Sequence, residues 1–310
     1  MARVVIGYDG SEQSHDALAL GVWLAEWIEA DVVLATAFPH MLASVDHERY
    51  ATALAHQSDP LAADALSRLP RLARGISLER RVTAGVPAAT GLRDIASGED
   101  ADLVVVGSTH RGAVGRVVPG SVGELLLHDA PCPVAIAPSG YADRGPQPPR
   151  IVGVAFDATE EARRAVRFAA ELARAASAAL RVFGVVEAVQ LGDVVYRSAA
   201  EEPDARFSRE ALEEELDRLI EDLPGEVGAQ RVLVAGSPAE ILVSKGRRAV
   251  DLMVTGTHGY GRLLRFLLGS VSSEVARRAP WPLVVVPPTA RIEFGGRESE
   301  AAHTDEVRAP

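Results

Sequence analysis

A glycine-rich segment in the C-terminal half is the part of the chain whose residue types and spacing most suggest chemistry. Residues 256–262 read GTHGYGR, and Gly269-Ser270 follows shortly afterwards. Glycines let the main chain approach a ligand closely, and a loop rich in them exposes N–H groups that can form an anion-binding concavity. A helix that begins at Ser270 would add further N–H groups and a partial positive charge. Arg262 and Arg265 could neutralise charge, so the segment favours phosphate binding.

Other polar residues near the expected strand ends have two interpretations each. Asp9 and Asp157 each follow a short apolar run, where a carboxylate either contacts a ligand or, more commonly, forms a turn or a helix cap. His110 and His258 lie in glycine-containing loops, where a solvated side chain is the common case and a catalytic base paired with a carboxylate is the rarer one. Cys132 lies between two prolines just before an apolar run, which indicates a packing residue.

The signatures of the common phosphate-processing enzymes are missing from the sequence. A Walker loop needs Gly-Lys-Ser/Thr, but the single lysine, Lys245, is outside any glycine loop. A Ser-Gly-Gly-x-Asp-Ser pyrophosphatase loop and a His-x-Gly-His nucleotidyltransferase motif are also absent. The sequence therefore predicts main-chain binding of a phosphate without an organised catalytic residue.

The elements that position these residues occur twice, because the chain contains an internal repeat. Residues 6–12 return as 154–160, 102–107 as 251–256, 120–122 as 269–271, and 131–138 as 280–287. With 310 residues, the chain has room for two domains. We expect domains at 1–138 and 151–288, a Pro/Gly-rich linker at 139–150, and a disordered tail at 289–310.

Each copy alternates short apolar runs with segments of helical periodicity. Unbroken apolar runs predict strands covered on both faces, and helices between them predict parallel crossovers. Ser237 and Ser121 have the spacing of helix caps, each followed by a glutamate three residues later. The predicted fold is α/β, with two tandem, open, doubly wound domains. The expected strands are 4–8, 32–38, 78–84, 103–106 and 134–137 in the first copy, and 151–156, 181–187, 230–235, 252–255 and 283–286 in the second.

The glycine spacing resembles one known family. Gly, two residues, Gly, nine residues and Gly-Ser form the nucleotide loop of ATP-binding universal stress proteins, and Gly256, Gly259, Gly269 and Ser270 match it in full. The first copy matches at three positions, but His110 replaces the second glycine, so its site is expected to bind weakly, differently or not at all. The early aspartates, the Gly-x-Pro sequences at 85–87 and 236–238 and the closing Pro-x-Pro sequences are also similar to the family.

This resemblance implies a Rossmann-like, adenine nucleotide alpha hydrolase-like fold, with ATP between the first and fourth strands of a five-stranded parallel sheet. Magnesium would be carried on the phosphates rather than by protein side chains. Alanines at 155 and 158, where the first copy has glycines, loosen the match in the second copy. The implied ligand contacts are Gly7, Asp9, Ala37, Gly107, Ser108, Thr109, His110, Arg111, Gly112, Ala113, Gly120, Ser121 and Val122 in the first copy, and Ala155, Asp157, Val185, Gly256, Thr257, His258, Gly259, Tyr260, Gly261, Arg262, Gly269, Ser270 and Val271 in the second.

The fifth strands suggest how the copies meet. Residues 134–137 and 283–286 are short, uncharged and β-prone, and an exposed edge of that kind promotes aggregation unless it is paired or covered. In the family the fifth strands pair across a dimer. We therefore expect the two copies to form an internal pseudo-dimer, and a further homodimer is left open.

Composition limits the partners and the compartment. A formal net charge of −11 argues against nucleic acid and against an anionic membrane surface. One cysteine, the absence of an evident leader sequence and the absence of a long apolar stretch predict a cytoplasmic location. The favoured hypothesis is an ATP-binding, nucleotide-dependent regulatory module of the stress response, with at most slow hydrolysis. The alternative is a ligand-free assembly module with vestigial loops; the protein partner and the stress are not assigned.

Overall fold

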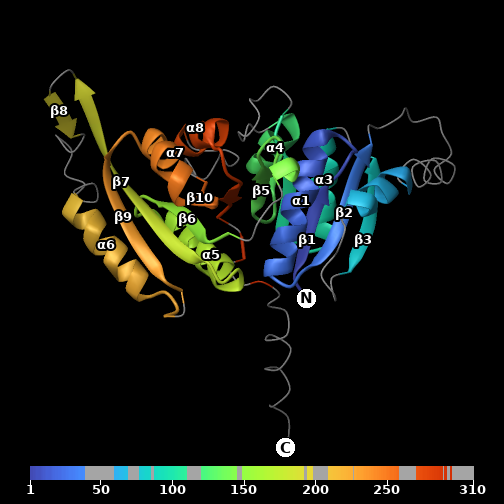
Figure 1. The fold of residues 1–310 in the computed structure, drawn as a ribbon, viewed down its shortest axis with the longest axis horizontal. Coiled ribbons are helices and arrows are strands. Elements are labelled where there is room, and N and C mark those ends of the chain that lie inside the picture. The colour runs from blue at the N-terminus through green and yellow to red at the C-terminus, as the bar shows by residue number, and fades with distance from the viewer. Residues whose placement is uncertain are drawn as a thin grey trace, which may run out of the picture.

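The computed structural model describes most of the chain. The described residues are 1–38, 59–68, 77–84, 87–109, 120–144, 149–191, 194–197, 209–225, 227–257, 270–288, 290–291 and 294. Within these ranges the chain forms one continuous 11-stranded sheet with helices on both faces (Figure 1). The sequence-predicted α/β class is confirmed.

The first half contributes five parallel strands in the order β3-β2-β1-β4-β5. Its strands are β1 (Arg3–Gly7), β2 (Asp31–Phe38), β3 (Leu78–Ala84), β4 (Leu103–Gly107) and β5 (Val134–Ala137). Its helices are α1 (Glu12–Trp27), a helical segment at 59–68, α3 (Ala88–Gly98), α4 (Ser121–Asp129) and the short η1 (Ala142–Arg144). Helices join parallel strands throughout, as the unbroken apolar runs predict.

The second half repeats this order with one addition. Its parallel strands are β6 (Ile151–Phe156), β7 (Ala179–Leu191), β9 (Ala229–Gly236), β10 (Leu252–Gly256) and β11 (Leu283–Val286). Its helices are α5 (Glu160–Ala175), α6 (Arg209–Glu221), α7 (Pro238–Ala249) and α8 (Ser270–Arg278). The addition is β8 (Val194–Arg197), which pairs antiparallel with the end of β7. The expected strand at 181–187 is thus too short, because the apolar run continues beyond the body of the sheet.

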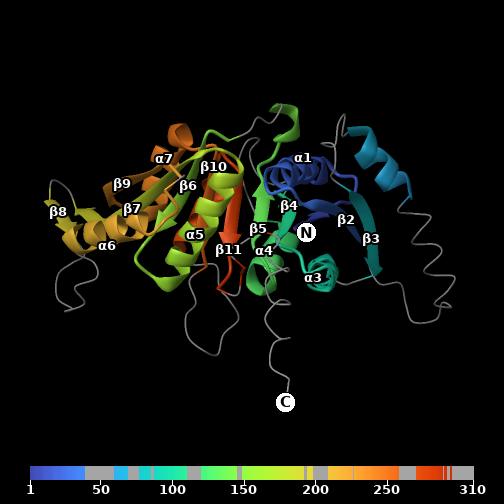
Figure 2. The same cartoon turned by 90° about the horizontal axis from the view of Figure 1, so that it is seen from below.

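The two halves meet through their fifth strands. β11 pairs antiparallel with β5, with Ala135 opposite Val284 at the centre of the register. Figure 2 shows β5 and β11 side by side in the middle of the molecule. The pairing expected from their exposed-edge character is therefore present, within one chain. What would be an edge strand in an isolated half becomes an interior strand.

Two hydrophobic cores cover the two faces of this sheet, and both extend across the joint. The first lies under α1, α5, α6 and the helix at 59–68, and its largest fully buried side chains include Leu24 and Phe168. The second lies under α3, α4, α7 and α8, and includes Cys132 and Trp281. Burial raises the pKa of the Cys132 thiol to about 12, in keeping with a packing role rather than a nucleophilic one.

One expected helix cap is wrong. Gly120, not Ser121, is the N-cap of α4, and its carbonyl accepts from the N–H of Glu124 at 2.8 Å. Ser121 is the first helical residue and its side chain is exposed. Ser237 does cap α7, with Pro238 following it, although its side chain makes no capping hydrogen bond. The helix therefore begins one residue earlier than the serine spacing suggests, because Ser121 already has helical geometry and Gly120 supplies the extended N-cap residue.

Candidate functional site

The candidate site lies at the carboxyl ends of the first and fourth strands of each half. In the first half, β1 has β2 on one side and β4 on the other; in the second half, β6 lies between β7 and β10. Strand order reverses at this point, and in open parallel sheets a ligand crevice forms there. The residues that follow β1 and β4 therefore lie together at one end of the first half of the sheet. Those that follow β6 and β10 lie together at the equivalent end of the second half.

The turns after β1 and β6 are built in the same way. Asp9 accepts hydrogen bonds from the N–H of Ser11 at 3.0 Å and from its hydroxyl at 2.5 Å. Asp157 accepts from the N–H of Thr159 at 3.1 Å and from its hydroxyl at 2.6 Å. Ser11 and Thr159 in turn cap α1 and α5. One carboxylate oxygen of each aspartate thus forms a turn, the commoner of its two sequence interpretations.

Asp9 remains at the surface of this edge and keeps its charge. Partial burial acts to raise the pKa of Asp9, but the hydrogen bonds from Ser11 outweigh it and hold the pKa below the ordinary value. The carboxyl group is therefore ionised at neutral pH, when it can only accept hydrogen bonds. A ligand group that contacts Asp9 must be a donor, such as a hydroxyl or an amino group.

Glycine at the end of the fourth strand is required by packing. A methyl group on Gly107 would lie 2.1 Å from the carbonyl oxygen of Gln13, in the first turn of α1. On Gly256 it would lie 2.8 Å from the carbonyl oxygen of Glu161, in the first turn of α5. Both distances are below any real contact, so these glycines let the first helix of each half approach its fourth strand. Their presence needs no ligand.

Gly120 is different, because nothing described around it demands a glycine. Its φ of −79° is open to any residue, and the nearest described atom to an added methyl group is Thr109 Cβ at 3.6 Å. Thr109 lies two residues after the end of β4, so this contact puts the end of β4 next to the start of α4. The N–H groups of the first turn of α4 therefore open beside the strand end, with the exposed Ser121 among them.

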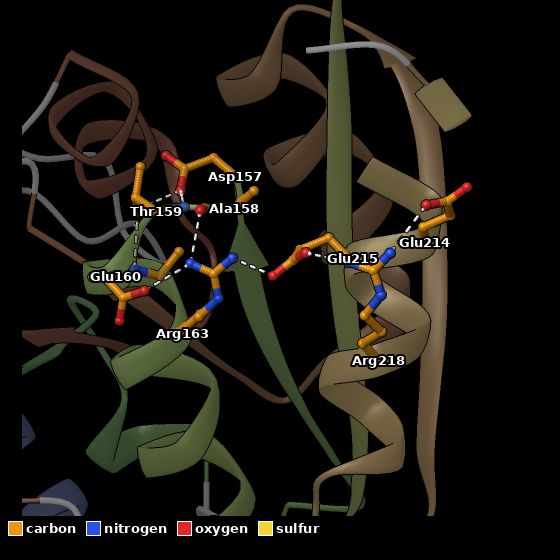
Figure 3. Close-up of polar contacts among 9 residues, drawn as sticks. Asp157, Ala158, Thr159, Glu160, Arg163, Glu214, Glu215 and Arg218 are labelled. Carbon is orange, nitrogen blue, oxygen red and sulfur yellow. Dashed lines mark hydrogen bonds and ion pairs between the residues drawn. The ribbon is translucent and has the colours of Figure 1, made fainter. Parts of the chain in front are cut away.

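A charged network joins the second site's edge to α6 (Figure 3). Arg163 of α5 donates to the carbonyl oxygen of Ala158 at 3.0 Å and to Glu160 at 2.9 Å. Its other terminal nitrogen donates to Glu215 of α6, which is bound in turn by Arg218. The network ties α6 to the turn that carries the aspartate of the second site.

The first half makes the same connection with other residues. Asp64, on the helix at 59–68, accepts from the Tyr8 hydroxyl, from His15 Nε2 at 3.3 Å and from Arg68 Nε at 3.1 Å. Tyr8 is buried, and its ring packs at an oblique angle against the His15 ring, with 5.8 Å between the ring centroids. Hydrogen bonds from Tyr8 and Arg68 lower the pKa of Asp64 to about 2. His15 and Arg163 thus play matching parts in the two halves.

Comparison with known proteins decides the family. The sequence profile described as "Universal stress protein family" matches residues 1–138 and 149–287. The chain belongs to the universal stress protein family. A universal stress protein of Mycobacterium tuberculosis is 29% identical over 299 residues, which cover 92% of this chain and 99% of that protein. A second one from that organism is 36% identical over 190 residues, covering 60% of this chain and 62% of the relative.

Solved universal stress proteins share the fold over nearly the whole chain. One from Archaeoglobus fulgidus aligns with 92% of this chain and 96% of its own, at a TM-score of 0.61 and 19% identity. These likenesses support the tandem α/β architecture of this family member. Among its described helices, none has both the length and the apolar character to cross a bilayer.

The structure places some of the expected ligand contacts of this family member and leaves others outside its described residues. Gly7 and Ala155 lie near the ends of β1 and β6, and Ala37 and Val185 lie on β2 and β7, all partly exposed. Ser108 and Thr257 follow β4 and β10, and both are buried. Val122 and Val271 lie in the first turns of α4 and α8. Outside the described residues lie His110, Arg111, Gly112, Ala113, His258, Gly259, Tyr260, Gly261, Arg262 and Gly269.

Sequence reasoning missed the network that frames each edge. It did not single out His15 and Asp64 in the first half or Arg163 and Glu215 in the second. The two partners of each pair lie in different helices, far apart in the sequence, so no local sequence motif predicts the pairing. The repeat is the signal that could have found them. His15 of α1 and Arg163 of α5 occupy matching positions, and each pairs with an acidic residue of the next helix in its half.

Proposed function

We propose that this protein is an ATP-binding regulatory module of the stress response. Its two crevices would hold an adenine nucleotide, with Mg²⁺ on the phosphates, and hydrolysis would be slow at most. A bound nucleotide would act by its differential affinity for conformers or partner complexes. The proposal includes two domains, at 1–138 and 151–288, and the ligand contacts expected from the sequence.

The observation that carries the proposal is the start of α4 beside the end of β4. Gly107 is explained by packing against Gln13, but Gly120 has space around it in the described structure and an unstrained φ. A glycine with no local requirement is expected where a ligand must approach the main chain closely. Main-chain N–H groups at a helix N-terminus favour a phosphate at that place. The matching loop in the second half has the complete glycine spacing.

Equilibrium dialysis of the full chain with labelled ATP, with and without Mg²⁺, tests the proposal. We expect retention at ligand concentrations below about 1 mM, the affinity of a weak specific site. Gly259→Asp should abolish retention, because it sets bulk and negative charge against the phosphates. His110→Asp is the matched control and should reduce retention less. Absence of any retention would overturn the proposal, and AMP and cAMP measured in parallel would define the preferred nucleotide.

A second candidate function is assembly without a ligand. It is favoured by the pairing of β5 with β11, which is complete in the structure, and by the use of Asp9 and Asp157 as turn formers. In this case the nucleotide loops would be vestigial, and the sheet joined through β5 and β11 would carry the function. Native mass spectrometry of the purified protein distinguishes the two: bound nucleotide supports the first function. Its absence, together with an oligomeric state that ATP does not change, supports the second.

A further inference from the structure

Two buried threonine hydroxyls at the end of β10 make no hydrogen bond within the described part of the chain. Thr255 is 2% exposed and Thr257 is 1% exposed, and neither Oγ1 has a hydrogen-bond partner among the described residues. A buried hydroxyl without a partner costs the free energy of the missing hydrogen bond, so almost all are satisfied in native proteins. Thr255 lies in β10 and Thr257 directly follows it, so two such hydroxyls close together at one strand end require an explanation.

Both hydroxyls belong to the layer between the sheet and α7 and α8. Met253 packs in that core, and strand alternation puts Thr255 on the same face. The N–H of Thr257 donates to the carbonyl oxygen of Val286 at 3.2 Å, which continues the ladder beyond β10 and the alternation with it. Ser272, in the first turn of α8, donates to the Gly256 carbonyl oxygen at 3.2 Å. Thr257 therefore lies where the strand end meets the start of α8.

The first half has no equivalent unpartnered pair. Val106 stands in place of Thr255, and Gly123 in place of Ser272. Ser108 stands in place of Thr257, but its hydroxyl donates to the carbonyl oxygen of Ala137 at 2.6 Å. The hydroxyl of the first half is thus committed to the protein, whereas that of the second half has no partner there.

We propose that the Thr257 hydroxyl serves an oxygen of the bound nucleotide, and that the second half is for this reason the tighter of the two sites. The inference rests on the proposed function. Without ligand the Thr257 hydroxyl is buried and has no partner in the described part of the chain, which penalises the empty state. A nucleotide that gives the hydroxyl a partner removes this penalty, and that difference adds to the affinity. Ser108 can do the same only by giving up its bond to Ala137.

Titration calorimetry with ATP and thermal unfolding of the full chain together test this inference. Thr257→Val keeps the size of the side chain and removes the hydroxyl. We expect the ligand-free variant to melt at a higher temperature than the wild type, and its tighter ATP site to weaken about fivefold, the worth of one neutral hydrogen bond. Thr257→Ser, which keeps a hydroxyl, should restore the affinity. Thr257→Ala repeats the test should the valine variant misfold.

Two matched variants separate ligand binding from stability. Thr255→Val removes the other buried, unpartnered hydroxyl, two residues earlier in the chain, and should raise the melting temperature without changing ATP affinity. Ser108→Ala should leave the tighter site unchanged. If the wild type binds ATP and Thr257→Val binds within twofold of it, the inference is overturned, as it would be if a trapped water were the partner. If the wild type binds no ATP, the proposed function fails, and this inference with it.

Discussion

Asp16 and Arg164 occupy the same position in α1 and α5, and each binds the segment that follows the last strand of its own half. Asp16 is buried and accepts from the N–H groups of Gly140 at 2.8 Å and Ala142 at 2.9 Å. Arg164 donates to the carbonyl oxygen of Ala290 at 2.9 Å. The repeat has thus preserved the anchor while reversing its polarity, because a backbone offers donors and acceptors alike.

The two anchors should differ in strength. Asp16→Ala leaves two N–H groups without their charged acceptor, so we expect the free energy of unfolding to fall by about 2–3 kcal/mol. Arg164→Ala removes one bond from a partly exposed site, and about 1 kcal/mol is expected. Urea unfolding followed by circular dichroism measures both. Equal losses in the two variants would contradict the difference in burial argued here.

Glycine at the end of the fourth strand should tolerate a methyl group less well in the first half than in the second. The added carbon of Gly107→Ala would lie 2.1 Å from a backbone oxygen, and that of Gly256→Ala 2.8 Å. We expect overpacking to lower the free energy of unfolding by about 3 kcal/mol or more for Gly107→Ala and by about 1–2 kcal/mol for Gly256→Ala. Gly98→Ala is the control, since nothing described lies within 4 Å of its added carbon. A reversed order in chemical denaturation would show that α1 can shift away.

The turn after β6 contains a residue that glycine should improve. Ala158 has a φ of 63°, whereas the matching residue of the first half is Gly10, with a φ of 80°. The left-handed region costs a residue with a side chain about 1 kcal/mol, so Ala158→Gly should raise the free energy of unfolding by up to that amount. Gly10→Ala should lower it by more, because its methyl group would also lie 2.8 Å from Leu61 Cδ2. Thermal melts of both variants check the opposite signs.

The Asp64 cluster should make the first half sensitive to acid. The pKa of this carboxyl group is lowered from 3.8 to about 2, chiefly by the hydrogen bond from Tyr8. An acid with a lowered folded-state pKa stabilises the fold above its unfolded pKa, and this stabilisation is lost as the pH falls through the folded value. The wild type should therefore melt above Asp64→Asn at neutral pH, and the gap should close between about pH 4 and pH 2. A gap that stays constant down to pH 2 would exclude this assignment.

Sequence alone predicted the regular part of the fold because its signals are local. The bounds expected for β3, β5, β6 and β11 agree with the structure. β5 and β11 are unbroken apolar runs and β6 is nearly so, whereas β3 carries three charged residues in its first half. β8 was not expected, although Gly192-Asp193 between two β-prone runs is a two-residue hairpin signal that the sequence reasoning overlooked. The cap of α4 was misplaced by one residue, since Ser121 and Gly120 both suit a helix start.

The candidate site was predictable in outline only. The repeat located the strand ends, and the position of Asp9 at the carboxyl edge of the sheet follows from its place after β1. The sequence could not separate glycines that packing requires, such as Gly107, from one that packing leaves free, such as Gly120, because the distinction depends on Gln13 and Thr109 across the fold. Likewise, the lone hydroxyl of Thr257 and the bonded one of Ser108 look alike in sequence.

Because β5 and β11 belong to one polypeptide, their pairing differs from a dimer interface in its response to dilution and in how its two sides can diverge in sequence. Two separate subunits joined at this strand would come apart as their concentration fell, whereas a linker keeps the effective local concentration high in any sample. Identical subunits must also keep identical surfaces, because every substitution appears on both sides of the symmetry axis. A fused pair is released from that rule, and its halves can specialise separately, as His15 and Arg163 or Ser108 and Thr257 already have.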